Sequence, residues 1–196
     1  MKRPQRPQCL PRLIPALAIA LAVVTGPALA DRVTDPDVGL SLEDGGPVAV
    51  SWTAPADFTE IRHSRNRFEA VRGDWVRDLA RHVADRAARA LHPGERLEVR
   101  ITDIDRAGDY EPGRGASDHV RVVRDIYPPR IDLAYTLRDA SGQVVASGER
   151  SLRDLGFLQR QPGTVGSSDP LRHEKQLVDR WVRTDLARAD PVRGDR

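Results

Sequence analysis

Residues 131–152 read IDLAYTLRDASGQVVASGERSL and contain the clearest strand pattern of the chain. Apolar and polar residues alternate from Ile131 to Leu137, which is the period of a half-buried strand. Residues 139–142 then supply the Asp, Ser and Gly that favour a turn, and residues 143–152 return as the partner strand. The stretch therefore predicts a β-hairpin.

Three further strands are expected upstream of this hairpin. Leu97, Val99 and Ile101 alternate with charged residues and predict a half-buried strand over residues 96–102. Residues 48–52 predict a first strand that ends before Pro55, because proline cannot donate a ladder hydrogen bond. Residues 120–126 predict a short strand that ends at a Pro-Pro pair.

Two segments show the helical period instead. Between Phe68 and Leu91, apolar residues recur every four positions, as at Trp75, Leu79, Val83 and Ala87. The second helix is expected to start at Ser168 as N-cap, with Pro170 in its first turn. Its apolar stripe comprises Leu171, Leu177 or Val178, Trp181 and Val182. The predicted fold is an α+β two-layer sandwich: a four- to five-stranded, mostly antiparallel sheet with two amphipathic helices on one face.

The first thirty residues have the three parts of a secretory signal. Four cationic residues precede an apolar run over residues 13–24, and Ala28-Leu29-Ala30 closes it with small residues around a leucine. The run is too short to span a bilayer, so cleavage after Ala30 and a periplasmic location are expected, with no transmembrane segment afterwards. We expect a flexible leader over 31–46, one α+β domain over 47–187 and a disordered tail over 188–196.

Cleavage would change the charge and the cysteine content. The chain has 31 Lys and Arg against 29 Asp and Glu, and residues 1–30 hold four of the cations and none of the acids. The remaining chain would carry a net charge of about −2, which argues against nucleic acid as a partner. Cys9, the single cysteine, would also be lost, which excludes disulfides and thiolate chemistry.

Five stretches together resemble the bacterial domain of unknown function 3016 family. They are SW (51–52) with FTEIR (58–62), TDID (102–105) with Gly108, RDIYPPRIDL (124–133), LRDLGF (152–157), and SSDPLR (167–172) with EK (174–175). The resemblance implies small exported proteins of Gram-negative bacteria, with no assigned activity or site residues.

Four acidic residues are the candidate metal ligands, namely Asp103, Asp105, Asp109 and Glu111. If the strand from Leu97 stays regular, Asp103 and Asp105 extend its inward row, and the four carboxylates could hold a calcium ion. Alternatively, a strand that ends or bulges near Thr102 turns Ile104 inward and leaves these carboxylates to pair with arginines such as Arg130. No other cofactor is expected.

The function expected first is that of a non-enzymatic binding or envelope-accessory module. Its partner would be an envelope protein or ligand that the sequence does not specify, docked on the free face or edge of the sheet. A calcium-binding module through residues 103–111 is the second reading. A hydrolase of envelope polymers, with two of these acids as an acid–base pair, is the third. No catalytic residue is assigned.

Overall fold

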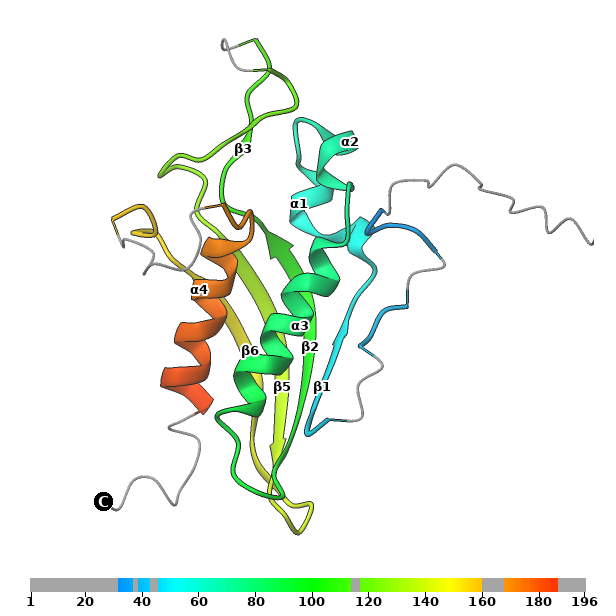
Figure 1. Cartoon of the computed structure of the whole chain (residues 1–196), viewed down its shortest axis with the longest axis vertical. Coiled ribbons are helices and arrows are strands. Elements are labelled where there is room, and N and C mark those ends of the chain that lie inside the picture. The colour runs from blue at the N-terminus through cyan, green and yellow to red at the C-terminus, as the bar shows by residue number, and fades with distance from the viewer. Residues whose placement is uncertain (1–31, 37–38, 43–45, 114–116, 160–167, 187–196) are drawn as a thin grey trace, which may run out of the picture.

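The computed structural model describes residues 32–36, 39–42, 46–113, 117–159 and 168–186 (Figure 1). The elements are β1 (Val48–Trp52), η1 (Pro55–Asp57), α1 (Thr59–Arg62), α2 (Arg67–Ala70), α3 (Trp75–Ala88), β2 (Arg96–Asp105), β3 (Asp109–Tyr110), β4 (Arg121–Val122), β5 (Arg130–Arg138), β6 (Val144–Arg153), α4 (Arg172–Trp181) and the π-helical turn η2 (Val182–Leu186).

One four-stranded sheet, in the order β1-β2-β5-β6, organises the domain. β1 runs parallel to β2, with α3 in the connection between them, and the β2–β5 and β5–β6 pairs are antiparallel. β3 and β4 form a separate two-stranded ribbon beyond the end of β2. The predicted α+β class with a mostly antiparallel sheet is therefore confirmed, and β5–β6 is the hairpin that residues 131–152 indicate.

The core lies between one face of the sheet and the helices α3 and α4, which lie side by side over it (Figure 1). The inward positions of β5 alternate as the sequence requires, from Ile131 at 0% exposed to Leu137 at 1%. The apolar stripe of α3 is buried against this layer, and Leu177, Val178 and Trp181 of α4 complete it. Burial of these stripes is the main stabilising contribution to the fold.

Three local predictions differ from the structure. The helical pattern over residues 68–91 divides into α2 and α3, because the chain turns between them at Gly73, whose φ is +83°. The strand expected over residues 120–126 is reduced to Arg121–Val122.

The start of the last helix is the third difference. α4 begins at Arg172 rather than just after Ser168, and the Asp169 carboxylate accepts the Leu171 N–H at 2.8 Å. Pro170 disfavours helical geometry at the residue before it, which accounts for the later start.

The described part of the expected leader contacts the domain. Val33 is buried, and its N–H donates to the Val71 carbonyl at 3.0 Å. Residues 40–42 exchange backbone hydrogen bonds with β1 through Val50 and Trp52. The expected signal (1–30) and tail (188–196) lie outside the described residues.

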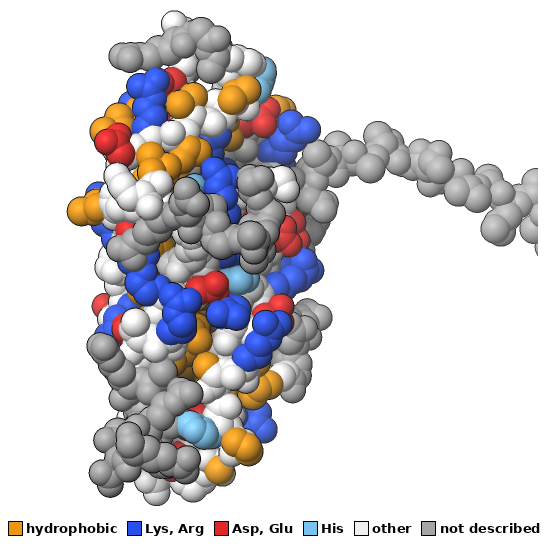
Figure 2. All heavy atoms as spheres, turned by 60° about the vertical axis from the view of Figure 1, so that its left-hand side comes forward, with side chains coloured by type: hydrophobic (Ala, Val, Ile, Leu, Met, Phe, Trp, Pro, Cys, Tyr) orange, Lys and Arg blue, Asp and Glu red, His pale blue; other side chains and the backbone are white. Residues whose placement is uncertain are grey.

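Charges of both signs are interspersed on the face drawn in Figure 2, where Lys and Arg side chains lie beside Asp and Glu side chains and hydrophobic side chains lie among them. Within the described ranges, no helix has both the length and the apolar character needed to cross a membrane.

Candidate functional site

A β-bulge near the end of β2 determines which way the acidic residues point. The pairing of β2 with β5 shifts register between Ile101 and Asp103, so that Ile104 points into the core at 0% exposed. The first alternative, in which Asp103 and Asp105 continue the inward row, is therefore wrong. The extra residue in the bulge moves both carboxylates to the face of the sheet opposite α3 and α4.

Asp103 is held by partners on that face. Its carboxylate accepts the Thr59 N–H and hydroxyl, both at 2.6 Å, and pairs with Arg130 at 2.6 Å. At Asp103 the structure thus agrees with the second alternative, in which the carboxylate pairs with an arginine. The same contacts attach the start of α1 to the sheet.

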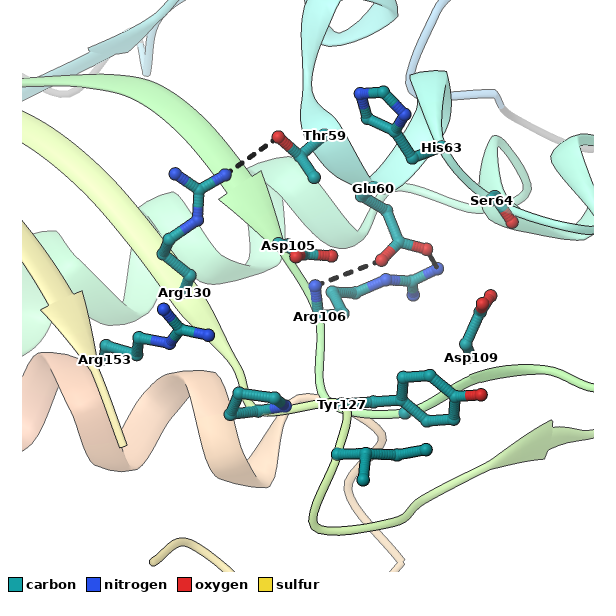
Figure 3. Close-up of a pocket in the computed structure, with 13 residues that line it drawn as sticks. Thr59, Glu60, His63, Ser64, Asp105, Arg106, Asp109, Tyr127, Arg130 and Arg153 are labelled. Carbon is teal, nitrogen blue, oxygen red and sulfur yellow. Dashed lines mark hydrogen bonds and ion pairs between the residues drawn. The ribbon is translucent and has the colours of Figure 1, made fainter. Parts of the chain in front are cut away.

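A cavity of about 350 Å³ lies where β2 ends, between α1, the segment after β2 and the start of β5 (Figure 3). Six charged residues line it, namely Glu60, Asp105, Arg106, Asp109, Arg130 and Arg153. Ile126, Tyr127 and Pro128 form an apolar wall. A small cavity that combines an apolar wall with converging polar groups is typical of a ligand site.

Glu60 and two arginines form a buried ion cluster at the wall of this cavity. Glu60, only 4% exposed, accepts the Arg106 backbone N–H at 3.1 Å and the Arg106 guanidinium at 2.9 Å. The Arg121 guanidinium also binds Glu60 and donates to the Gly108 carbonyl at 2.6 Å. Arg106 in turn stacks on Trp75, 4.4 Å from the ring centre. Glu60 is thus ionised and held between two guanidinium groups, and the cluster forms a fixed wall of the cavity.

The segment that leaves β2 is held from the other side by α4. Glu174 is fully buried in the first turn of α4, and its Oε1 accepts the Ala107 N–H at 2.6 Å. Burial raises the pKa of Glu174. The adjacent Gly108 has a φ of +82°, and a Cβ there would lie 2.6 Å from the Val122 carbonyl oxygen, so this close approach requires glycine.

Asp105 differs from the other carboxylates of the cavity. It is half-buried, and no hydrogen bond or ion pair joins it to any described residue. Burial and, next, the nearby Glu60 charge raise the pKa of Asp105 from 3.8 to about 6, although Arg130 opposes the shift. An ionised Asp105 is therefore disfavoured by its surroundings in the folded protein.

Asp109 and Glu111 are bound to separate partners. Asp109 lies 3.4 Å from Arg65, and Glu111 pairs with Arg124 at 2.7 Å and accepts the Tyr127 hydroxyl at 3.2 Å. In the part of the chain that the structure describes, no three acidic, histidine or cysteine residues form a group that could hold a metal ion. The calcium hypothesis stays a prediction.

Sequence reasoning missed Glu60, Arg106, Arg153 and Glu174 as members of one site. A signal was nevertheless present, since each of the five stretches that carry the family resemblance contributes to the cavity or its support. They provide Glu60, Asp105, Arg130, Arg153 and Glu174 in chain order.

The fold and the site together define an α+β domain with a charged cavity at one end of its sheet. Residues 46–184 match the family described as a protein of unknown function, DUF3016, and the chain belongs to that family. No curated protein and no solved structure matches the chain.

Proposed function

We propose that this chain is an exported periplasmic binding module and that its ligand occupies the cavity at the end of β2. Export is supported by the basic start, the apolar run and the small residues before Asp31. Binding is supported by a cavity whose polar groups converge on one space while its walls are fixed by the Glu60 cluster and by Glu174.

Export predicts a defined N-terminus. The protein recovered from the periplasm of its native host is expected to begin at Asp31, because Ala28 and Ala30 present the small residues that the peptidase requires. Intact-mass spectrometry of that fraction measures this directly. Recovery of the chain with Met1 in the cytoplasmic fraction would refute export.

The observation that carries the binding proposal is the unpaired Asp105 carboxyl. The four other acids of this region are engaged by arginines, whereas Asp105 faces the cavity without a partner among the described residues. A protein that keeps such a group at a cost in stability commonly does so for function. The carboxylate offers a ligand an acceptor for a cationic or hydrogen-bonding group.

Replacing Asp105 with asparagine is expected to stabilise the protein above pH 6. The folded pKa of about 6 exceeds the ordinary 3.8, so the free energy of unfolding falls as pH rises through this interval. With allowance for solvent screening, the free energy of unfolding of the variant at pH 8 exceeds that of the unchanged protein by about 1–2 kcal/mol. This difference vanishes near pH 4. Urea unfolding at the two pH values gives the comparison.

Asp85→Asn, on the exposed side of α3, is the matched control and should change stability by less than about 0.5 kcal/mol at either pH. If Asp105→Asn destabilises the protein at pH 8, Asp105 has a structural partner and the argument for binding fails.

Hydrolysis is the weaker alternative, although Glu60, Asp105 and Asp109 do share one cavity. A carboxyl with a pKa near 6, as at Asp105, suits proton transfer. The second carboxylate of a glycosidase pair must remain available, however, and Glu60 is bound by two arginines while Asp109 is paired with Arg65. Binding is therefore the function that the geometry favours.

A further inference from the structure

A row of three charged residues crosses the sheet at the cavity. Asp105 of β2 is the register partner of Arg130 of β5, and Arg130 is the register partner of Arg153 of β6. Residues that are directly opposite in adjacent strands project to the same face. All three line the cavity, where Arg130 and Arg153 lie together beside Asp105 (Figure 3).

The two arginines differ in how far their charges are satisfied. Arg130 pairs with Asp103 at 2.6 Å and with Asp132 at 2.8 Å. Arg153 is exposed and makes no hydrogen bond or ion pair with any described residue. Like charges directly opposite each other are unfavourable in a sheet, so a cross-strand Arg pair with one unpaired member favours a bound anion.

The opposite end of the row carries an unpaired acidic side chain. Asp105 is an unpaired acceptor one strand from Arg130 and two strands from Arg153. Adjacent strands are about 4.8 Å apart, so the row spans roughly 5–10 Å. A ligand complementary to it would carry a cation at one end and an anion at the other. The wall of Ile126, Tyr127 and Pro128 would contact the atoms between them.

We propose that the cavity binds a short zwitterion of the peptide type, an inference that rests on the proposed function. Its anionic group contacts Arg153 with support from Arg130, and its ammonium group contacts Asp105. The small cavity of about 350 Å³ limits the ligand to a few residues. An α-amino acid holds its two charges too close together to reach both ends of the row, whereas a tripeptide can.

The test uses triglycine and two derivatives that each lack one charge. The exported protein is titrated at pH 7.5 with triglycine, N-acetyl-triglycine and triglycine amide, and binding is followed by NMR at the amides of Asp105 and Tyr127. Triglycine is expected to give saturable shifts, and each derivative should bind at least about tenfold more weakly because it loses one charge-assisted contact.

O-phosphoethanolamine is titrated in parallel as a second zwitterion. Tighter binding of that probe than of triglycine would identify a lipid headgroup as the source of the zwitterion.

Two variants assign the charges to residues. Arg153→Gln should weaken triglycine about tenfold and remove the preference over triglycine amide, whereas Asp105→Asn should remove the preference over N-acetyl-triglycine. Arg100→Gln, an exposed arginine earlier on β2, is the matched control and should bind triglycine like the unchanged protein.

The possible failures are distinguishable. Glucose is titrated in the same way as an uncharged probe. If glucose shifts the cavity resonances saturably and neither zwitterion does, the cavity binds a ligand and the zwitterion inference is wrong. Equal binding of triglycine and N-acetyl-triglycine overturns the role of Asp105. If no probe in the panel shifts the cavity resonances, the inference and the proposed function both fail.

Discussion

Replacing Glu60 with alanine is expected to lower the free energy of unfolding by about 3–5 kcal/mol, because removing one partner of a buried ion pair leaves the others uncompensated. Arg106 and Arg121 both depend on this carboxylate, and their side chains are only 11% and 18% exposed. Urea unfolding at neutral pH measures the loss.

The control for Glu60 is an ion pair on the same sheet that lies at the surface. Glu98, whose side chain is 65% exposed, lies 3.8 Å from Arg138, and Glu98→Ala should change stability by less than about 1 kcal/mol. The conservative Glu60→Gln keeps the shape and loses the charge, so a large loss in this variant too would assign the effect to charge. Equal, small effects of Glu60→Ala and Glu98→Ala would show that the cluster does not stabilise the site.

Periodicity predicted most of the fold because it records which face of each element is buried. The alternation from Ile131 to Leu137 and the four-residue spacing from Trp75 to Ala87 are both preserved in the structure. The capping and turn details at Gly73 and Asp169 were less predictable. They depend on single backbone conformations, and tertiary packing selects among several that the sequence permits.

The candidate site was less predictable than the fold for two physical reasons. One bulge between Ile101 and Asp103 reverses the direction of every later side chain in β2, and periodicity does not reveal where a bulge falls. In addition, Glu60 and Glu174 have the sequence pattern of surface acids in the first turns of helices. They are buried because the segment after β2 packs against both, which is a contact between segments distant in sequence.

α4 links the stability of the core to the geometry of the cavity. Glu174 and Trp181 are seven residues apart on this helix, which places them on one face. Trp181, 2% exposed, meets Tyr135 edge-to-face at 5.7 Å, and Glu174 holds the Ala107 N–H next to the cavity. The position of the cavity segment therefore depends on how firmly Trp181 anchors the helix.

Trp181→Ala is accordingly expected to lower the free energy of unfolding by about 3–5 kcal/mol, through lost burial and the space left beside Tyr135. The thermal midpoint should fall by roughly 10 °C for a domain of this size. Trp181→Phe is the informative control. It keeps a ring against Tyr135 and removes an indole N–H that has no acceptor among the described residues, so it should cost only about 1–2 kcal/mol. Calorimetry of both variants gives the comparison, and equal losses would mean that ring packing against Tyr135 is not what holds α4 in place.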